Sequence, residues 1–135
     1  MIVIDASVAV KLVTREPGGD AALERVLSED ERLAPDWIRM EVGNALSRKV
    51  REAGLPPTDA HSARTAVLAY LTQEVPSLAL LDSAFALSLL LRHGLYDCLY
   101  LATALRHGGI VVTADKQFAE RASIGGYADQ VELIA

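Results

Sequence analysis

Short apolar runs that do not alternate with polar residues recur along the chain, and longer segments of helical character separate them. The clearest runs are residues 1–4 and 109–113, which are rich in β-branched residues; weaker runs stand at 32–34, 75–81 and 131–134. A strand that is apolar on both faces must be covered on both faces, which is typical of a parallel sheet between two layers of helices. The sequence therefore predicts an α/β fold, a three-layer α/β/α sandwich with a central, mostly parallel sheet.

Helices are expected between and after these strands. Asp36, Thr58 and Asp82 are expected to cap three of them, because short polar side chains accept hydrogen bonds from the free amides of a first turn. Gly54 and Gly94 are expected to end two of them. The expected ranges are 6–13, 20–27, 37–53, 58–72, 82–93, 97–107 and 115–122.

The length and charge of the chain limit what it can be. Its 135 residues suit one ordinary domain, and no repeat or linker divides them, so residues 1–135 are expected to form a single domain. A net charge of −5 argues against a general nucleic-acid binder that neutralises phosphates over a basic surface. An enzyme that handles nucleic acid in one cleft is not excluded, because acids gathered in that cleft would bias the net charge.

The sequence carries no sign of export. Its one cysteine, Cys98, lies in an apolar segment and is expected in the core, so there is no disulfide framework. The N-terminal apolar run contains Asp5 and lacks the basic start of a signal peptide. The run at 78–91 is interrupted by Asp82 and is too short to span a bilayer. We therefore expect a cytoplasmic protein with no membrane partner.

Four acidic residues stand where a parallel sheet builds its sites. Asp5 and Asp115 follow the two clearest strands, and ligands of parallel sheets bind at the carboxyl ends of the strands, where the strand order reverses. Asp97 interrupts the apolar segment 95–105 near an expected helix start, and Glu41 lies mid-helix beside an apolar stripe. Because an unpaired carboxylate out of water costs several kcal/mol, Asp97 needs either solvent or a charged partner.

Singly, these acids have ordinary interpretations, as helix N-caps for the aspartates and as a surface charge for Glu41. Together they would repel one another unless a cation meets them. Oxygen ligands favour Mg²⁺ or Mn²⁺ over structural zinc. The histidines, His61, His93 and His107, show no metal-ligand spacing and are interpreted as surface or helix-end residues.

The acids also indicate a reaction. A carboxylate cage for Mg²⁺ commonly activates water and stabilises charge on a phosphoryl group. The sequence shows no evident nucleophile, no histidine base and no glycine-rich phosphate loop. Several acids spread along a chain that lacks these other groups indicate hydrolysis of phosphodiester bonds by metal-activated water.

The chain resembles the PIN-domain ribonucleases, and within them the VapC toxins of bacterial toxin–antitoxin pairs. The resemblance rests on four segments in order, VIDASVAVK, MEVGNALSRKV, YDCLYLATA and VVTADKQFAE. Together they extend over essentially the whole chain, and four motifs at these separations are far more specific than any one of them.

The resemblance implies an α/β/α sandwich whose acids bind Mg²⁺ or Mn²⁺ and cut single-stranded or looped RNA. It also implies a cognate antitoxin protein that covers the cleft, and a homodimer of the toxin. Matched residue by residue, the catalytic and metal-binding acids are Asp5, Glu41, Asp97 and Asp115, and the supporting polar residues are Ser7, Asn44 and Thr113.

Other functions stay open. A housekeeping PIN nuclease of RNA maturation would use the same acids, and a catalytically silent PIN-like module would bind without cutting. An aspartyl phosphatase is poorly supported, because it needs a second aspartate where Ser7 stands. Basic residues that follow two of the acids are candidates to guide RNA phosphates, although a solvated surface is the simpler interpretation; they are Arg48, Lys49, Arg51 and Lys116.

Overall fold

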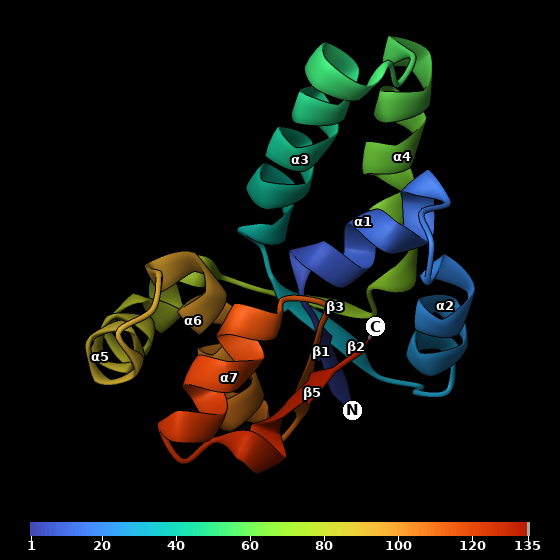
Figure 1. Cartoon of the computed structure of the whole chain (residues 1–135). Coiled ribbons are helices and arrows are strands. Elements are labelled where there is room, and N and C mark those ends of the chain that lie inside the picture. The colour runs from blue at the N-terminus through green and yellow to red at the C-terminus, as the bar shows by residue number, and fades with distance from the viewer. Residues whose placement is uncertain (135) are drawn as a thin grey trace.

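Five parallel strands form one sheet in the computed structural model, which describes residues 1–134 (Figure 1). Their order across the sheet is β3-β2-β1-β4-β5. The central strand β1 pairs with β2 on one side and with β4 on the other, both in parallel. The strands are β1 (Ile2–Ile4), β2 (Arg32–Pro35), β3 (Gln73–Val75), β4 (Ile110–Thr113) and β5 (Val131–Leu133).

Helices cover both faces of this sheet, which confirms the predicted α/β sandwich. One layer contains α1 (Ala6–Thr14), α2 (Gly19–Leu27), α3 (Ile38–Ala53) and α4 (Pro57–Tyr70). The other contains α5 (Leu81–Leu91), α6 (Leu95–His107) and α7 (Lys116–Ile124), and short 3₁₀ turns η1 (Ser77–Leu80) and η2 (Ala128–Gln130) precede α5 and β5. In Figure 1, α3 and α4 lie side by side and project beyond the sheet.

The central strands are buried on both faces, as the unbroken apolar runs predict. Ile2, Val3 and Ile4 of β1 are fully buried, and burial of each such side chain contributes about 2 kcal/mol. Helix α6 is the most buried helix, with every residue from 98 to 104 inside the core. Cys98 is one of them, which confirms its assignment to the core.

The strand order reverses between β1 and β4, which creates a topological switch point there. From β1 the chain moves outward to β2 and β3, then returns to place β4 on the opposite side of β1. The carboxyl ends of β1 and β4 therefore lie side by side, and the Asp5 amide donates a hydrogen bond to the Val112 carbonyl at 3.1 Å. Parallel α/β sheets bind ligands at this position.

The strand predicted at 75–81 is wrong. Strand β3 ends at Val75, and the apolar residues after Pro76 form the 3₁₀ turn η1. Two hydrogen bonds hold this turn against the start of α3: Ser77 N donates to Asp36 Oδ1 at 3.0 Å, and Trp37 N donates to Ser77 Oγ at 2.9 Å. Asp36 therefore ties two loops together and does not cap α3.

Several predicted helix ends also differ from the structure. Thr58 lies inside α4, which begins at Pro57, a residue suited to a first turn because its missing amide is not needed there. Asp82 lies in the first turn of α5, one residue after its start. Gly94 does not end that helix, because Arg92 already adopts a left-handed conformation with φ 52°. Gly54, with φ 74°, ends α3 as predicted.

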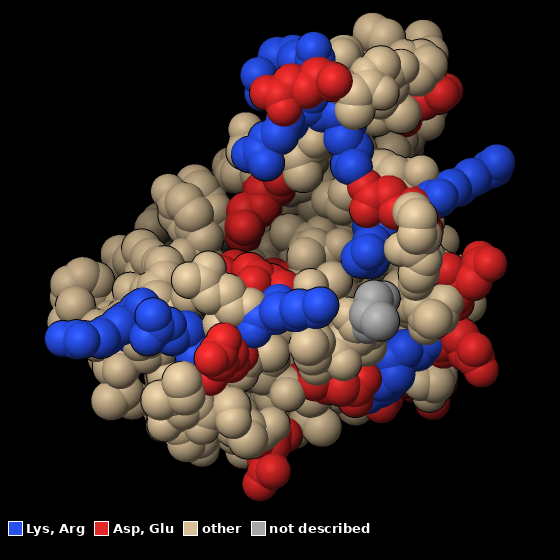
Figure 2. Space-filling view, in the orientation of Figure 1, with Lys and Arg blue, Asp and Glu red and all other residues tan. Residues whose placement is uncertain are grey.

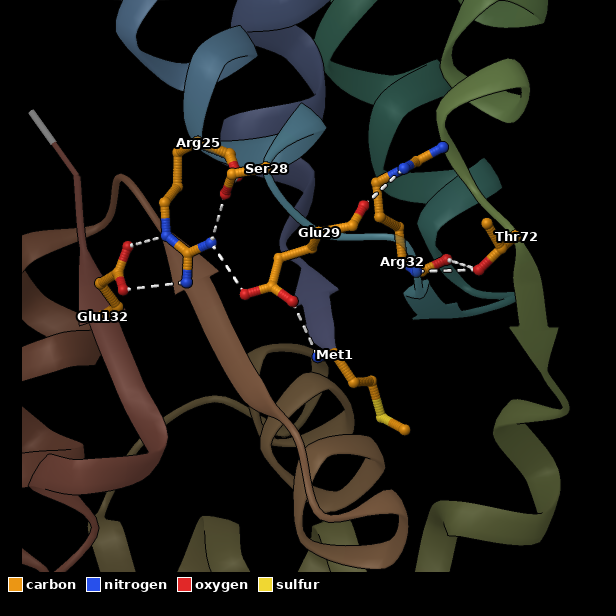
Figure 3. Close-up of polar contacts among 7 residues, drawn as sticks. All are labelled: Met1, Arg25, Ser28, Glu29, Arg32, Thr72 and Glu132. Atoms are coloured by element: carbon orange, nitrogen blue, oxygen red, sulfur yellow. Dashed lines mark hydrogen bonds and ion pairs between the residues drawn. The ribbon is translucent and has the colours of Figure 1, made fainter.

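A polar network ties α2 to the edge strand β5 (Figure 3). The Arg25 guanidinium donates to both carboxylate oxygens of Glu132, at 2.7 and 3.2 Å, and to Glu29 at 3.2 Å. Glu29 also accepts a hydrogen bond from the terminal ammonium of Met1 at 2.9 Å. Planar bidentate pairs of this kind fix orientation as well as adding energy.

No single helix within residues 1–134 is long and apolar enough to cross a membrane. Only the pair Ser77–Leu91 and Leu95–His107 reaches that length and composition, and it is bent by 115° at the break.

Candidate active site

Asp5 is buried directly after β1, with 3% of its surface exposed. Its Oδ2 accepts hydrogen bonds from Ser7 Oγ at 2.5 Å and from Thr113 Oγ1 at 2.8 Å. Burial, with a smaller contribution from the Asp97 charge, raises its pKa from 3.8 to about 6 despite these donors. Asp5 occupies the N-cap position of α1, but its side chain makes no capping hydrogen bond to that helix.

The two predicted hydroxyl residues join the loops that carry the acids. Thr113 Oγ1 donates to Asp5 and accepts a hydrogen bond from Asp115 N at 3.0 Å. Ser7 Oγ donates to Asp5 and accepts one from Ala114 N at 3.0 Å. These bonds fix the end of β1 against the end of β4, and with it the relative positions of Asp5 and Asp115.

Asp115 is the N-cap of α7, as expected. Its Oδ1 accepts hydrogen bonds from Gln117 N at 3.0 Å and from Phe118 N at 3.1 Å. One oxygen is thus held by the first turn of the helix, which fixes the direction of the carboxylate.

Asp97 lies in the first turn of α6, and its partner is a histidine. His93 Nε2 lies 2.5 Å from Asp97 Oδ2, and only 9% of the His93 side chain is exposed. Burial raises the pKa of Asp97, the neighbouring His93 lowers it, and the Asp115 charge adds a smaller rise. His93 lies just past the end of α5, as a helix-end residue would, but its side chain is largely buried and is not a surface group. His61 is exposed and His107 ends α6.

Glu41 reaches the cluster from α3. Burial, together with the charges of Asp5 and Asp97, raises its pKa to about 7, against a smaller lowering by the Tyr100 hydroxyl. The same carboxylates raise the pKa of the buried Tyr100 well above its usual value. Within residues 1–134, neither Glu41 Oε1 nor the Tyr100 hydroxyl completes a hydrogen bond.

These features fit a cation held by carboxylates. Asp5, Glu41 and Asp97 are linked by electrostatic repulsion, and the charge of Asp115 acts on Asp97. Burial favours the neutral forms of Asp5, Glu41 and Asp97 in the absence of a counter-charge. Glu41 Oε1 is buried near the Tyr100 hydroxyl but completes no hydrogen bond within the described residues, so this oxygen could serve as a ligand to a cation. Among the described residues, ligand atoms of His93, Asp97 and Asp115 also lie within 4.8 Å of one another.

A cleft of about 680 Å³ opens beside these acids. Ser7, Glu41 and Asn44 line it, as do Tyr96 and Ala114, which precede Asp97 and Asp115 in the chain. Figure 2 shows acidic side chains inside this hollow, below the projecting α3 and α4, and Lys and Arg side chains along its rim. Asn44, the predicted polar neighbour of Glu41, is thus exposed in the cleft.

The basic residues at the rim differ in their partners. Lys49 pairs with Glu16 across the cleft, while Arg48 also lines it and is exposed. Arg51 donates to Ser47 in a separate groove between α3 and α4, and Lys116 is exposed and does not line the cleft.

Known proteins resemble this chain in sequence and in fold. A family model described as PIN domain matches residues 2–124. The chain belongs to the PIN-domain family. It is 34% identical to a curated protein of Pyrobaculum aerophilum named Ribonuclease VapC3, over 89% of this chain and 93% of that one. The crystal structure of PAE2754 from the same organism has the same fold, with a TM-score of 0.68 at 20% identity, over 89% of this chain and 84% of that one.

Sequence reasoning missed three aromatic side chains and one imidazole at this PIN-domain site. Tyr100 is buried close enough to the acids for their charges to act on its hydroxyl. Trp37 and Tyr96 stack on each other in the cleft wall, and His93 contacts Asp97. No helical spacing rule links His93 to Asp97, because α5 ends at Leu91, α6 begins at Leu95, and His93 lies in the break between the two helices. The contact depends on how the chain turns at this break, which the sequence pattern does not show.

Proposed function

We propose that this PIN-domain protein is a metal-dependent endoribonuclease and the toxin of a toxin–antitoxin pair. The observation that carries the proposal is the cluster of acids in which Asp5, Glu41 and Asp97 are linked by repulsion and the buried Glu41 Oε1 completes no hydrogen bond within the described residues. The name of the relative, Ribonuclease VapC3, supports the choice of RNA as the substrate.

Each acid has a distinct part in this proposal. Asp5 and Asp97 are the principal ligands of Mg²⁺ or Mn²⁺, and Asp115 and Glu41 complete the cage directly or through water. Ser7 and Thr113 hold one oxygen of Asp5, which leaves its other oxygen free for the cation. When bound, the cation would activate water and stabilise the charge that develops on the scissile phosphate.

The wall of the cleft suits an unpaired stretch of RNA. Tyr96 is 52% exposed and stacks on Trp37, with 4.8 Å between ring centroids and 27° between planes. An exposed ring held from behind by a second ring is a platform for a nucleobase, and stacking does not require a particular base. With Arg48 at the rim for a phosphate, Tyr96 would hold the base next to the scissile bond.

Two protein partners belong to the same proposal. The cognate antitoxin would cover the cleft, where a basic side chain would meet the acids. A second copy of the chain would cover the apolar face formed by Leu78, Leu81, Phe85 and Leu89 on η1 and α5, which are between 41% and 87% exposed. Apolar faces of this kind on a surface commonly mark a protein contact.

The proposal is tested with the purified protein, freed of any partner, and total RNA from its own host. We expect a few discrete RNA ends with Mg²⁺, none with chelator, and none with the Asp97→Asn variant. Asp20→Asn is the matched control, since Asp20 is an exposed acid in the first turn of α2. Equal patterns in all lanes would contradict the proposal and favour a silent binding module.

The toxin assignment has its own test. Expression of the chain in its host should arrest growth, and co-expression of the product of an adjacent small gene should restore it. Cleavage in vitro without any growth arrest would leave a nuclease but exclude the toxin role.

A further inference from the structure

We propose that His93 is a positioning residue for Asp97. Its Nε2–H holds one oxygen of the Asp97 carboxylate, so that the other oxygen points to the cation. This inference rests on the proposed metal-dependent function. The pattern of four acids in the sequence did not predict this role for His93.

The contact itself is short and sheltered. His93 Nε2 lies 2.5 Å from Asp97 Oδ2, and the side chains are only 9% and 23% exposed. Hydrogen bonds to an ionised acceptor at such distances are among the strong ones in proteins. A histidine that donates from Nε2 fixes both its own tautomer and the rotation of the carboxylate.

The imidazole is in turn held from two sides. Its ring stacks on Phe118 of α7, with 5.4 Å between centroids and 16° between planes. The backbone of His93 is clamped to the end of α5, since its amide donates to Ser88 O at 3.2 Å and its carbonyl accepts from Ser88 Oγ at 2.6 Å. A side chain restrained at its backbone and its ring is suited to orient another group.

This contact also links the two helices that carry aspartates. His93 precedes α6, which carries Asp97, and it packs on Phe118, whose amide donates to Asp115 Oδ1 at 3.1 Å. His93 therefore sets the relation between Asp97 and Asp115 from behind the site. Such outer partners of metal ligands typically change metal affinity by 10–100-fold when they are removed.

Direct ligation by His93 is the alternative to separate. Ligand atoms of His93, Asp97 and Asp115 lie within 4.8 Å of one another, so an imidazole ligand is geometrically conceivable. However, a nitrogen that donates its hydrogen to Asp97 has no lone pair for a metal. The geometry therefore points to positioning.

Two substitutions at one position distinguish these roles. His93→Phe keeps an aromatic ring for Phe118 but removes the donor, and His93→Gln removes the ring but places an amide N–H near the position of Nε2. The readout is the affinity for Mn²⁺, from the electron paramagnetic resonance signal of free Mn²⁺ with the full chain freed of partners. We expect His93→Phe to raise the Kd for Mn²⁺ by about 10–100-fold and His93→Gln by less than about threefold.

Controls keep the result interpretable. His61→Phe, at an exposed position of α4, should bind Mn²⁺ like the wild type. Circular dichroism without metal verifies folding, and His93→Leu replaces His93→Phe if the latter does not fold. Nuclease activity with Mn²⁺ should fall in parallel with the affinity.

Each outcome has one meaning. Unchanged Mn²⁺ affinity in the donor-free variant overturns the inference and leaves the proposed function intact. Equal losses in the Phe and Gln variants, with ¹⁴N coupling to Mn²⁺ in the wild type, overturn it in favour of direct ligation. Equal losses without such coupling overturn it in favour of a packing role for the ring. Absence of Mn²⁺ binding to the wild type refutes the proposed metal-dependent function itself.

Discussion

Asp5→Asn should make the metal-free protein more stable. The folded state raises the pKa of Asp5 from 3.8 to about 6, chiefly because the carboxylate is buried. A raised carboxyl pKa means that the folded state disfavours the charged form of Asp5. The stability that the neutral form contributes to the folded state is therefore fully present below pH 3.8 and is lost as the pH rises through about 6. A shift of roughly two units corresponds to about 3 kcal/mol at neutral pH and above.

Asparagine suits this test because it retains the local contacts. Its amide oxygen can accept the hydrogen bonds that Ser7 and Thr113 now donate to Oδ2. The desolvated charge and its repulsion with Asp97 are removed. We therefore expect the free energy of unfolding of metal-free Asp5→Asn to exceed that of the wild type by about 3 kcal/mol at pH 8, or roughly 10 °C in Tm. The difference should shrink toward zero near pH 4.

Urea unfolding in chelator, from pH 4 to pH 8, measures this difference directly, with Asp20→Asn as the exposed control. Added Mn²⁺ should then raise the stability of the wild type more than that of the variant, because only a folded site binds the ion. A variant no more stable than the wild type at pH 8 in chelator would refute the reasoning.

Four further outcomes are expected. Asp97→Asn should abolish RNA cleavage with little loss of stability, as measured by cleavage assays and thermal melts. Tyr96→Leu should weaken the binding of single-stranded RNA in chelator by about 5–50-fold, whereas Tyr96→Phe should not, and an abasic nucleotide at the scissile position should remove the difference. Leu89→Lys should convert a dimer to a monomer in analytical ultracentrifugation, with cleavage retained. Arg25→Met should lower the free energy of unfolding by about 1 kcal/mol, because its pairs with Glu132 and Glu29 are partly exposed (Figure 3).

The buried strands were predictable because their composition determines them. Residues 1–4 and 109–113 are β-branched and apolar on both faces, and they became the adjacent strands β1 and β4. Strand β3 could not be found in this way, since Gln73 and Glu74 are polar and the strand forms by pairing with β2 at the sheet edge. An edge strand depends on tertiary pairing more than on its own residues.

The positions of the acids were predictable from topology. Carboxyl ends of parallel strands meet at one edge, so Asp5 and Asp115 had to approach each other if β1 and β4 were neighbours. Side-chain contacts between residues far apart in the chain could not be predicted in this way. Ser77, which engages Asp36, lies 41 residues away from it in the chain, so no local pattern distinguishes that contact from a helix cap.

The apolar setting of Asp97 now has a physical explanation. The carboxylate is met by the first turn of α6 and by His93, and both favour its charged form. Neither offsets burial fully, because the pKa of Asp97 is still raised. The same holds for Asp5 and Glu41, so the metal-free site disfavours the charges that it would present to a cation under the proposed function. It follows that metal binding should strengthen as the pH rises through 6 to 7, and that a bound cation should stabilise the fold. If the proposed function holds, Asp97, Asp5 and Glu41 lower the stability of the metal-free protein in exchange for the ability to bind the cation.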